Sequence, residues 1–171
     1  LKALEQCTAP KLVVADTMNL WIDIARPELD ELLTKIDGLV LNDEEAKMLS
    51  GETNLIRAAR KVLAMGPRFV ILKKGEHGAF VIGGEDLHFS IPAYPVDEVV
   101  DPTGAGDSFA GGFMGYVAAE DKTDDATLRQ AMLYGTVTAS FAVQGFSDEV
   151  LVKNERSALQ ERIQELRSIV T

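Results

Sequence analysis

Residues 99–112 have the sequence VVDPTGAGDSFAGG, in which an apolar pair leads into a proline, two closely spaced glycines and an aspartate. Glycine has no Cβ and tolerates positive φ, so residues 102–106 can turn their backbone amides toward one point. A helical pattern follows near Asp107, and a helix N-terminus adds free N–H groups and partial positive charge. The stretch therefore predicts an anion site that suits a phosphate.

Asp107 lies at the edge of this predicted anion site. A carboxylate repels phosphate, but it is well suited to taking a proton from a hydroxyl group that attacks phosphorus. Amides that hold the charge and a base that activates the nucleophile together indicate phosphoryl transfer. By itself, an aspartate at a helix start is also typical of an N-cap, so the interpretation depends on the rest of the chain.

Two other phosphate-binding motifs do not fit the sequence. Phe109 occupies the position of the third glycine in Gly-x-Gly-x-x-Gly, which argues against dinucleotide binding. The pattern Gly-x4-Gly-Lys-Ser/Thr is absent from the sequence, which disfavours a P-loop nucleotidase.

Composition limits the class of protein. A chain of 171 residues with 46% hydrophobic residues is typical of one ordinary α/β domain, and we expect a single domain over residues 1–171. The net charge of -10 makes nucleic acid an unsuitable partner. No apolar run reaches the ~20 residues that span a bilayer, and no signal-peptide pattern begins the chain, so we expect a cytoplasmic protein without a membrane partner. Cys7 is the single cysteine, which excludes an internal disulfide and a cysteine-cluster metal site.

Apolar runs and helical patterns alternate along the chain, which predicts a mostly parallel sheet with helices on its faces. Strands are predicted at residues 11–16, 37–42, 68–74 and 96–101, with a hairpin over 78–91 that turns near Gly83 and Gly84. Helices are predicted at residues 27–36, 43–51, 54–66, 106–119, 125–143 and 155–169. Ligands bind beyond the carboxyl ends of parallel strands, so we expect a cleft lined by the polar residues at 16–19, 42–45, 73–78 and 101–107.

The segment DPTGAGDSFAGGF resembles the C-terminal signature of the ribokinase family, also called the phosphofructokinase B (PfkB) family of carbohydrate and nucleoside kinases. LNDEEAKMLSG resembles the family's Asn-x-x-Glu motif, LKKGEHGAFV its nucleotide-side strand-turn-strand, and YGTVTASFAVQGFS the helix and loop beside the adenine. The resemblance implies the C-terminal portion of a ribokinase-like three-layer α/β/α sandwich. The family's N-terminal sugar-contacting sheet, lid strands and early Gly-Gly motif have no counterpart here, so we expect a chain that is truncated at its N-terminus.

The resemblance also implies roles for individual residues. Asp107 matches the catalytic base, and the backbones of Gly104, Ala105 and Gly106 match the anion hole that holds the transferring phosphoryl group. Asn42 and Glu45 match the pair that orders Mg²⁺, partly through water. The positions that match nucleotide-binding residues are Asn42, Glu45, Lys73, Gly75, Gly78 and Ser140, and those that match a K⁺ site are Asp101 and Thr103.

Several of these residues have a structural alternative. Asn42 and Glu45 have the spacing of a capping box, and Lys73 and Lys74 are also consistent with a solvated strand end. Other residues are interpreted as structural only: Gly111, Gly112 and Gly115 as close packing against the sheet, His77 and His88 as surface residues, and residues 154–170 as an amphipathic packing helix.

The sequence therefore predicts an ATP-dependent, Mg²⁺-dependent kinase that transfers the γ-phosphoryl group to a hydroxyl of a small sugar or sugar-like substrate. A nucleoside kinase, a catalytically silent nucleotide-binding fragment and a dinucleotide-dependent oxidoreductase remain as alternatives. The chain alone is expected to bind nucleotide weakly, to show little sugar kinase activity and to form homo-oligomers through an exposed sheet edge.

Overall fold

The computed structural model describes residues 2–84 and 86–170. The chain divides into two compact units, one formed by Leu1–Lys74 with Phe80–Phe89 and the other by Gly75–Ala79 with Ser90–Thr171. We call them unit 1 and unit 2 and treat each by itself. The expectation of a single domain stays a prediction.

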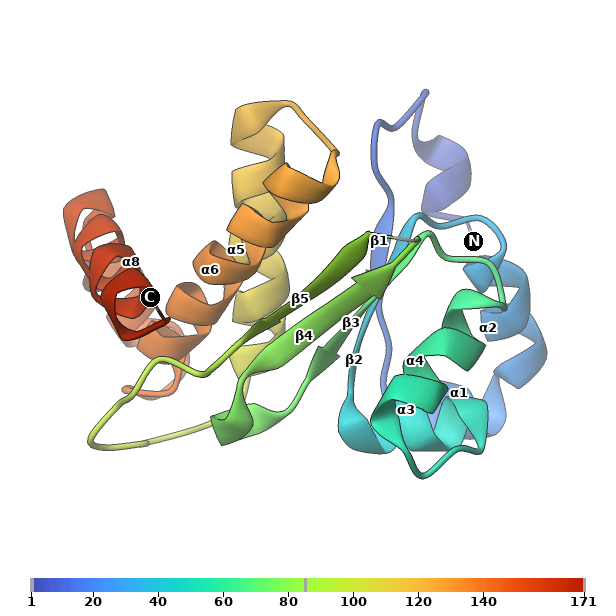
Figure 1. The fold of residues 1–171 in the computed structure, drawn as a ribbon, viewed down its shortest axis with the longest axis horizontal. Helices are drawn as coiled ribbons and strands as arrows, with labels where there is room; N and C mark the ends of the chain where they lie inside the picture. Colours follow the sequence, from blue (N-terminus) through green and yellow to red (C-terminus); the bar gives the residue numbers. More distant parts are fainter. Residues whose placement is uncertain (1, 85, 171) are drawn as a thin grey trace. The chain divides into compact units, whose positions relative to one another are not determined.

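The strands form one mixed sheet, which has five strands within the described residues, in the order β1-β2-β3-β4-β5 (Figure 1). The strands are β1 (Val14–Asp16), β2 (Gly38–Asn42), β3 (Phe69–Lys73), β4 (Ala79–Gly83) and β5 (Leu87–Ile91). β1 is parallel to β2, and β2 is parallel to β3, with Asn42 opposite Lys73. Because β2 and β3 are buried along nearly their whole length, the polar side chains at their carboxyl ends are the ones available for chemistry.

Unit 1 packs short helices against these strands. They are α1 (Asn19–Ile24), α2 (Arg26–Leu33), α3 (Asp43–Ser50) and α4 (Leu55–Leu63), preceded by the 3₁₀ turn η1 (Leu4–Gln6). Their buried faces join the strands in one core that includes Leu33, Leu41, Leu49, Val62 and Leu72. This core fixes the carboxyl ends of β2 and β3 at the start of α3.

Unit 2 is built mainly from helices. They are α5 (Ala105–Glu120), α6 (Asp125–Ala142), α7 (Glu149–Lys153) and α8 (Arg156–Val170), with the 3₁₀ turn η2 (Gly75–His77). α5 and α6 approach closely at Gly112, where an added Cβ would lie 2.4 Å from Thr138 Oγ1 and 2.8 Å from the Tyr134 carbonyl oxygen. α8 places Ile163 and Leu166 in the core, as expected of a packing helix.

The predicted helices are confirmed, with ends that differ by a few residues, and so are the hairpin and the strands at 11–16, 37–42 and 68–74. The strand predicted at 96–101 is wrong. Val99 and Val100 are 55% and 56% exposed, and the amides of Val100 and Asp101 both donate to the Val143 carbonyl at the end of α6 instead of to a strand. The sequence analysis also missed the two shortest helices, α1 and α7.

Two predictions about glycines need correction. Gly112 packs against α6 and not against the sheet, while an added Cβ at Gly111 or Gly115 meets nothing within 4 Å. Gly104 adopts the expected positive φ of 78°, but Gly106 does not, because it already lies in the first turn of α5.

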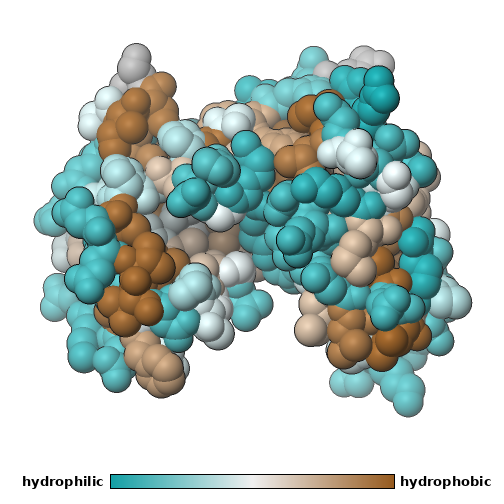
Figure 2. Space-filling view, turned by 90° about the horizontal axis from the view of Figure 1, so that it is seen from below, coloured by the Kyte–Doolittle hydropathy of each residue, from teal (hydrophilic) through white to brown (hydrophobic). Residues whose placement is uncertain are grey.

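The described residues contain no helix long and apolar enough to cross a membrane. Hydrophobic areas are separated by hydrophilic ones on the face shown in Figure 2. The large apolar side chains that are exposed in unit 1 include Met18, Leu20, Trp21 and Ile24, in and just before α1.

Candidate functional site

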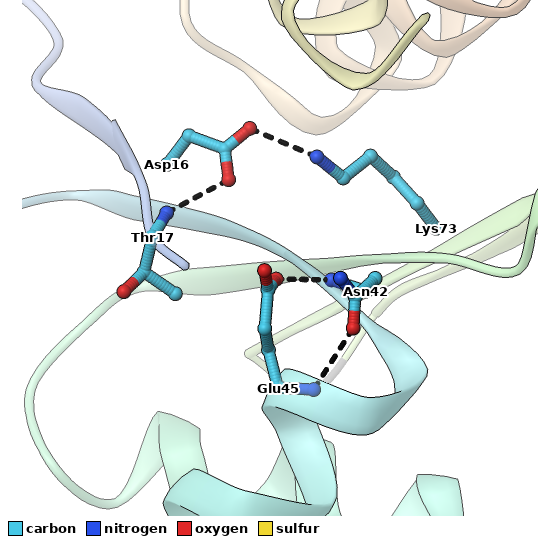
Figure 3. Close-up of polar contacts among 5 residues, drawn as sticks. All are labelled: Asp16, Thr17, Asn42, Glu45 and Lys73. Carbon is cyan, nitrogen blue, oxygen red and sulfur yellow. Dashed lines mark hydrogen bonds and ion pairs between the residues drawn. The ribbon is translucent and has the colours of Figure 1, made fainter. Parts of the chain in front are cut away.

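Unit 1 gathers four polar side chains at the carboxyl ends of its parallel strands, which we call the strand-end group: Asp16, Asn42, Glu45 and Lys73 (Figure 3). Asp16 ends β1, Asn42 ends β2, Lys73 ends β3, and Glu45 lies in the first turn of α3. Parallel pairing brings the strand ends to the same edge of the sheet, as the alternation of strands and helices predicted.

Asn42 and Glu45 form a capping box. The Glu45 amide donates to Asn42 Oδ1 at 2.9 Å, and the Asn42 amide donates to Glu45 Oε2 at 2.7 Å. The structural alternative for this pair is therefore realised, and it fixes the orientation of both side chains. One carboxylate oxygen of Glu45 is engaged in the cap, which leaves Oε1 for a further contact.

Glu45 is buried, with only 6% of its surface exposed. Burial raises the pKa of its carboxyl group above the ordinary value, while the Asn42 N–H and the Lys73 ammonium lower it and the Asp16 charge raises it. Glu45 therefore interacts electrostatically with two other members of the strand-end group, and a cation nearby would favour its ionised form.

Lys73 is held by an ion pair and is not a solvated strand end. Its Nζ lies 2.9 Å from Asp16 Oδ2, and the two side chains are 18% and 26% exposed. The other Asp16 oxygen accepts the Thr17 amide at 2.7 Å, which fixes the carboxylate. Lys74 has its ammonium 5.9 Å from the centre of the Phe80 ring and belongs to the packing of unit 1.

Unit 2 carries the glycine-containing turn, residues 101–107. Gly104 is the N-cap of α5 in the left-handed conformation, with φ 78° and ψ 0°. A glycine N-cap has no side chain to accept the first amides of the helix. Within the described part of the chain, the amides of Gly104, Gly106 and Asp107 have no acceptor, whereas the Ala105 amide donates to the Pro102 carbonyl at 3.2 Å. The turn thus offers open N–H donors at a helix N-terminus, which is the chemistry that binds an anion.

Asp107 is exposed in the first turn of α5. Its carboxylate takes part in no hydrogen bond or ion pair with any described residue, so it does not act as an N-cap here. Asp101 is different, because its Oδ1 accepts the Thr103 amide at 2.9 Å and this bond lowers the pKa of Asp101. The Asp101–Thr103 bond shapes the turn, and neither residue's placement tests the predicted K⁺ site.

The remaining nucleotide-binding predictions fall in unit 2. Gly75 and Gly78 have positive φ, at 54° and 82°, and a Cβ on Gly78 would lie 2.1 Å from the Ile91 carbonyl oxygen. Gly78 therefore has a packing reason to be glycine. Ser140 is buried in the last turn of α6, where its hydroxyl donates to the Val137 carbonyl and accepts from Arg162. His77 and His88 are exposed, as predicted.

The strand-end group suits Mg²⁺ held through water. Among the described residues, no three His, Cys, Asp or Glu side chains gather as a metal-binding cluster. Mg²⁺ prefers oxygen ligands, keeps several waters and uses one or two carboxylates together with substrate phosphates. The carboxylates of Asp16 and Glu45 supply oxygens of this kind. Asp16 was expected in the lining of the cleft but was given no role there, although its place at the end of a predicted strand was visible in the sequence.

Comparison with known proteins gives the family. The sequence pattern of the pfkB family carbohydrate kinases matches residues 2–152, and the chain belongs to this family. A cytidine kinase from Thermococcus kodakarensis is 39% identical over 91 residues, which are 52% of this chain and 32% of that protein.

Solved structures give the same fold, which confirms the predicted fold class. Aminoimidazole riboside kinase from Salmonella enterica, complexed with aminoimidazole riboside and an ATP analog, superposes with a TM-score of 0.75 at 24% identity, over 89% of this chain and 52% of that one. An E. coli protein described as a ribokinase II, in complex with ATP and Mg²⁺, has a TM-score of 0.71 at 27% identity, over 88% and 47%. The chain thus spans a third to about a half of the length of these relatives.

Proposed function

We propose that this chain is the nucleotide-binding part of an ATP-dependent kinase that transfers a γ-phosphoryl group to a hydroxyl of a small sugar or nucleoside. The observation that carries the proposal is the 101–107 turn, where open amides at a helix start lie beside a carboxylate that no described residue engages. An aspartate at the N-cap position normally accepts an amide of the first helical turn, whereas Asp107 lies three residues past the N-cap Gly104 and accepts none. An unengaged one next to an anion site is suited to chemistry.

In this mechanism the amides of Gly104 and Gly106 hold the transferring phosphoryl group, because their N–H dipoles face the charge that develops on its oxygens. Asp107 accepts the proton from the attacking hydroxyl. Its carboxylate is exposed and engaged by no described residue, so it is accessible to a hydroxyl group, as a general base must be. The Ala105 amide is already bonded to Pro102, so we assign the donor role to the two glycines.

The strand-end group supplies the charge that a nucleotide needs. Mg²⁺ bound with ATP would neutralise charge on its phosphates, and Glu45 with Asn42 would hold the waters of that ion. Lys73 would face the phosphates as a compact positive charge, oriented by its ion pair with Asp16. The capping box supports this role, since it fixes Asn42 and Glu45 before any ligand binds.

The relatives are named for different acceptor substrates, and both nucleosides and sugars occur among them. The cytidine kinase and the aminoimidazole riboside kinase act on nucleosides by their names, and the ribokinase II on a sugar. Their shared feature is a hydroxyl on a ribose-sized ring, and this is the substrate class that we propose.

The test is the substitution Asp107→Asn, with Asp125→Asn in the first turn of α6 as the matched control. Calorimetry measures ATP affinity in the presence of Mg²⁺, and an ADP-release assay over a panel of sugars and nucleosides measures turnover or slow hydrolysis. We expect Asp107→Asn to lower the rate by roughly 10²–10⁴-fold while ATP affinity persists, because the amide keeps the shape but cannot accept the proton. A wild-type chain that binds no ATP, or an Asp107→Asn variant with the wild-type rate, would contradict the proposal.

A further inference from the structure

Arg162 on α8 belongs neither to the strand-end group nor to the 101–107 turn, but it contacts two aromatic rings and two hydrogen-bond acceptors. Its Cζ is 3.7 Å from the centre of the Phe141 ring and 4.6 Å from that of Tyr94, so the guanidinium stacks on two aromatic side chains. Burial lowers its pKa from the ordinary value. Among the described residues it forms no salt bridge, and the nearby Glu165 carboxylate instead accepts a short hydrogen bond from the Tyr94 hydroxyl.

The hydrogen bonds of Arg162 go to the end of α6. Its Nη1 donates to Ser140 Oγ and to Gln144 Oε1, each at 2.9 Å. These two acceptors flank Val143, the C-cap of the helix. A helix end has carbonyl groups without intrahelical partners and frays unless other groups hold it. Arg162 therefore fixes the last turn of α6.

The same last turn holds the glycine-containing turn. The Val143 carbonyl accepts the Val100 amide at 2.8 Å and the Asp101 amide at 3.3 Å. The side chain of Asp101 in turn accepts the amide of Thr103, and Thr103 directly precedes Gly104. Hydrogen bonds and neighbouring residues within unit 2 thus connect the guanidinium to the N-cap of α5.

We propose that Arg162 is a positioning residue for the 101–107 turn. It touches neither the open amides nor Asp107, and it acts by holding the Val143 carbonyl where the amides of Val100 and Asp101 bind it. The stacked, planar guanidinium suits this role, because it can donate to two acceptors in a fixed geometry while its faces pack on rings. The consequence for ATP rests on the proposed function, whereas the mechanical coupling does not.

The experiment measures amide hydrogen exchange in the wild-type chain and in Arg162→Met, with Arg162→Lys as a milder second variant. Arg156→Met, an exposed arginine on the same helix, controls for loss of charge. Leu166→Ala removes buried atoms from α8 while leaving the bonds of Arg162, and controls for loss of stability. We expect the amides of Val100, Asp101 and Thr103 to exchange roughly tenfold faster in Arg162→Met, the change expected for loss of about one hydrogen bond.

The location of the effect decides the outcome. Faster exchange at residues 100–103, with the middle of α5 unchanged, supports the proposal. Unchanged exchange there, an equal increase throughout α5 and α6, or the same local increase in Leu166→Ala would overturn it.

ATP affinity, measured by calorimetry on the same variants, should fall about tenfold in Arg162→Met and stay within about twofold of wild type in Leu166→Ala at a temperature where both are folded. A wild-type chain that binds no ATP would refute the proposed function, while the exchange data would still decide the positioning role.

Discussion

Replacing Glu45 separates its two roles, as the acceptor in a capping box and as a buried negative charge. Glu45→Gln keeps the size of the side chain and an oxygen that can accept the Asn42 amide, and glutamine is accepted at this position of a capping box. Glu45→Ala removes the acceptor, and a buried N–H left without a partner costs about 1–3 kcal/mol. For a chain of 171 residues this lowers the melting temperature by roughly 2–12 °C. We expect the free energy of unfolding of Glu45→Gln to remain within about 1 kcal/mol of the wild-type value at pH 7. The substitution removes a buried negative charge, which is favourable, and this offsets the weaker hydrogen bond that glutamine accepts from the Asn42 amide.

The dependence on pH gives the sharper result. Burial raises the pKa of Glu45 in the folded chain, so the stability associated with its protonated form is complete below the ordinary pKa and is lost as the pH rises through the raised value. Glutamine does not titrate. The free energy of unfolding of the wild type should therefore increase relative to Glu45→Gln as the pH falls from 7 toward the ordinary range of glutamate. Urea titrations at several pH values measure this difference. A difference that does not change with pH, or a Glu45→Gln variant as unstable as Glu45→Ala at pH 7, would refute the reasoning.

The Mg²⁺ concentration needed for ATP binding should also rise in Glu45→Gln. An unchanged Mg²⁺ requirement would mean that Glu45 acts only as a helix cap.

Two further predictions concern packing and capping away from the candidate site. Gly112→Ala should destabilise the chain by about 1–3 kcal/mol in urea titrations, because the new Cβ would lie 2.4 Å from Thr138 Oγ1 on α6. Gly115→Ala is the control and should be neutral or stabilising, because its Cβ meets nothing within 4 Å. Equal effects of the two substitutions would contradict the close packing of α5 on α6. Asn54 caps α4 by accepting the Arg57 amide at 3.0 Å, so Asn54→Ala should lower the free energy of unfolding by about 0.5–2 kcal/mol. Asn54→Ser should lose much less, because serine can also cap the helix. Thermal unfolding measures both variants, and an Asn54→Ser variant as unstable as Asn54→Ala would contradict the capping role.

Residues whose roles depend on local spacing were predictable from the sequence. Asn42 and Glu45 lie three apart at a strand end, and that spacing predicted the capping box, whereas their role at a cation came from the family resemblance and stays a prediction. The structure shows the cap directly. Gly104 and Gly106 were both expected to accept positive φ because glycine has no Cβ, and of the two only Gly104 adopts it, as the N-cap of α5.

Residues whose roles depend on distant partners were not predictable in this way. Val99 and Val100 have the composition of a strand, but the Val143 carbonyl, more than forty residues away in the sequence, takes the amides that a strand would use. Arg162 gave no signal, since its rings and acceptors come from two segments that are distant from it in the sequence, Tyr94 and residues 140–144. The ion pair of Asp16 with Lys73 likewise depends on how β1 and β3 pair with β2, which lies between them. The sequence pattern predicts parallel strands, but it does not predict which residues lie opposite one another.

The start of α5 differs from the starts of α3, α4 and α6 in a way that suits it to holding a phosphoryl group. Asn42, Asn54 and Asp124 each accept an amide from the first turn of α3, α4 and α6, so these helices satisfy part of their own N-termini. The N-cap of α5 is Gly104, which has no side-chain oxygen to accept an amide, and the amides of Gly106 and Asp107 have no acceptor among the described residues. An uncapped helix start is less stable than a capped one, and an anion supplies the missing acceptor together with a favourable interaction with the helix dipole. The feature that weakens α5 as an isolated helix is therefore the one that favours binding of a phosphate there, with Asp107 beside it to receive a proton.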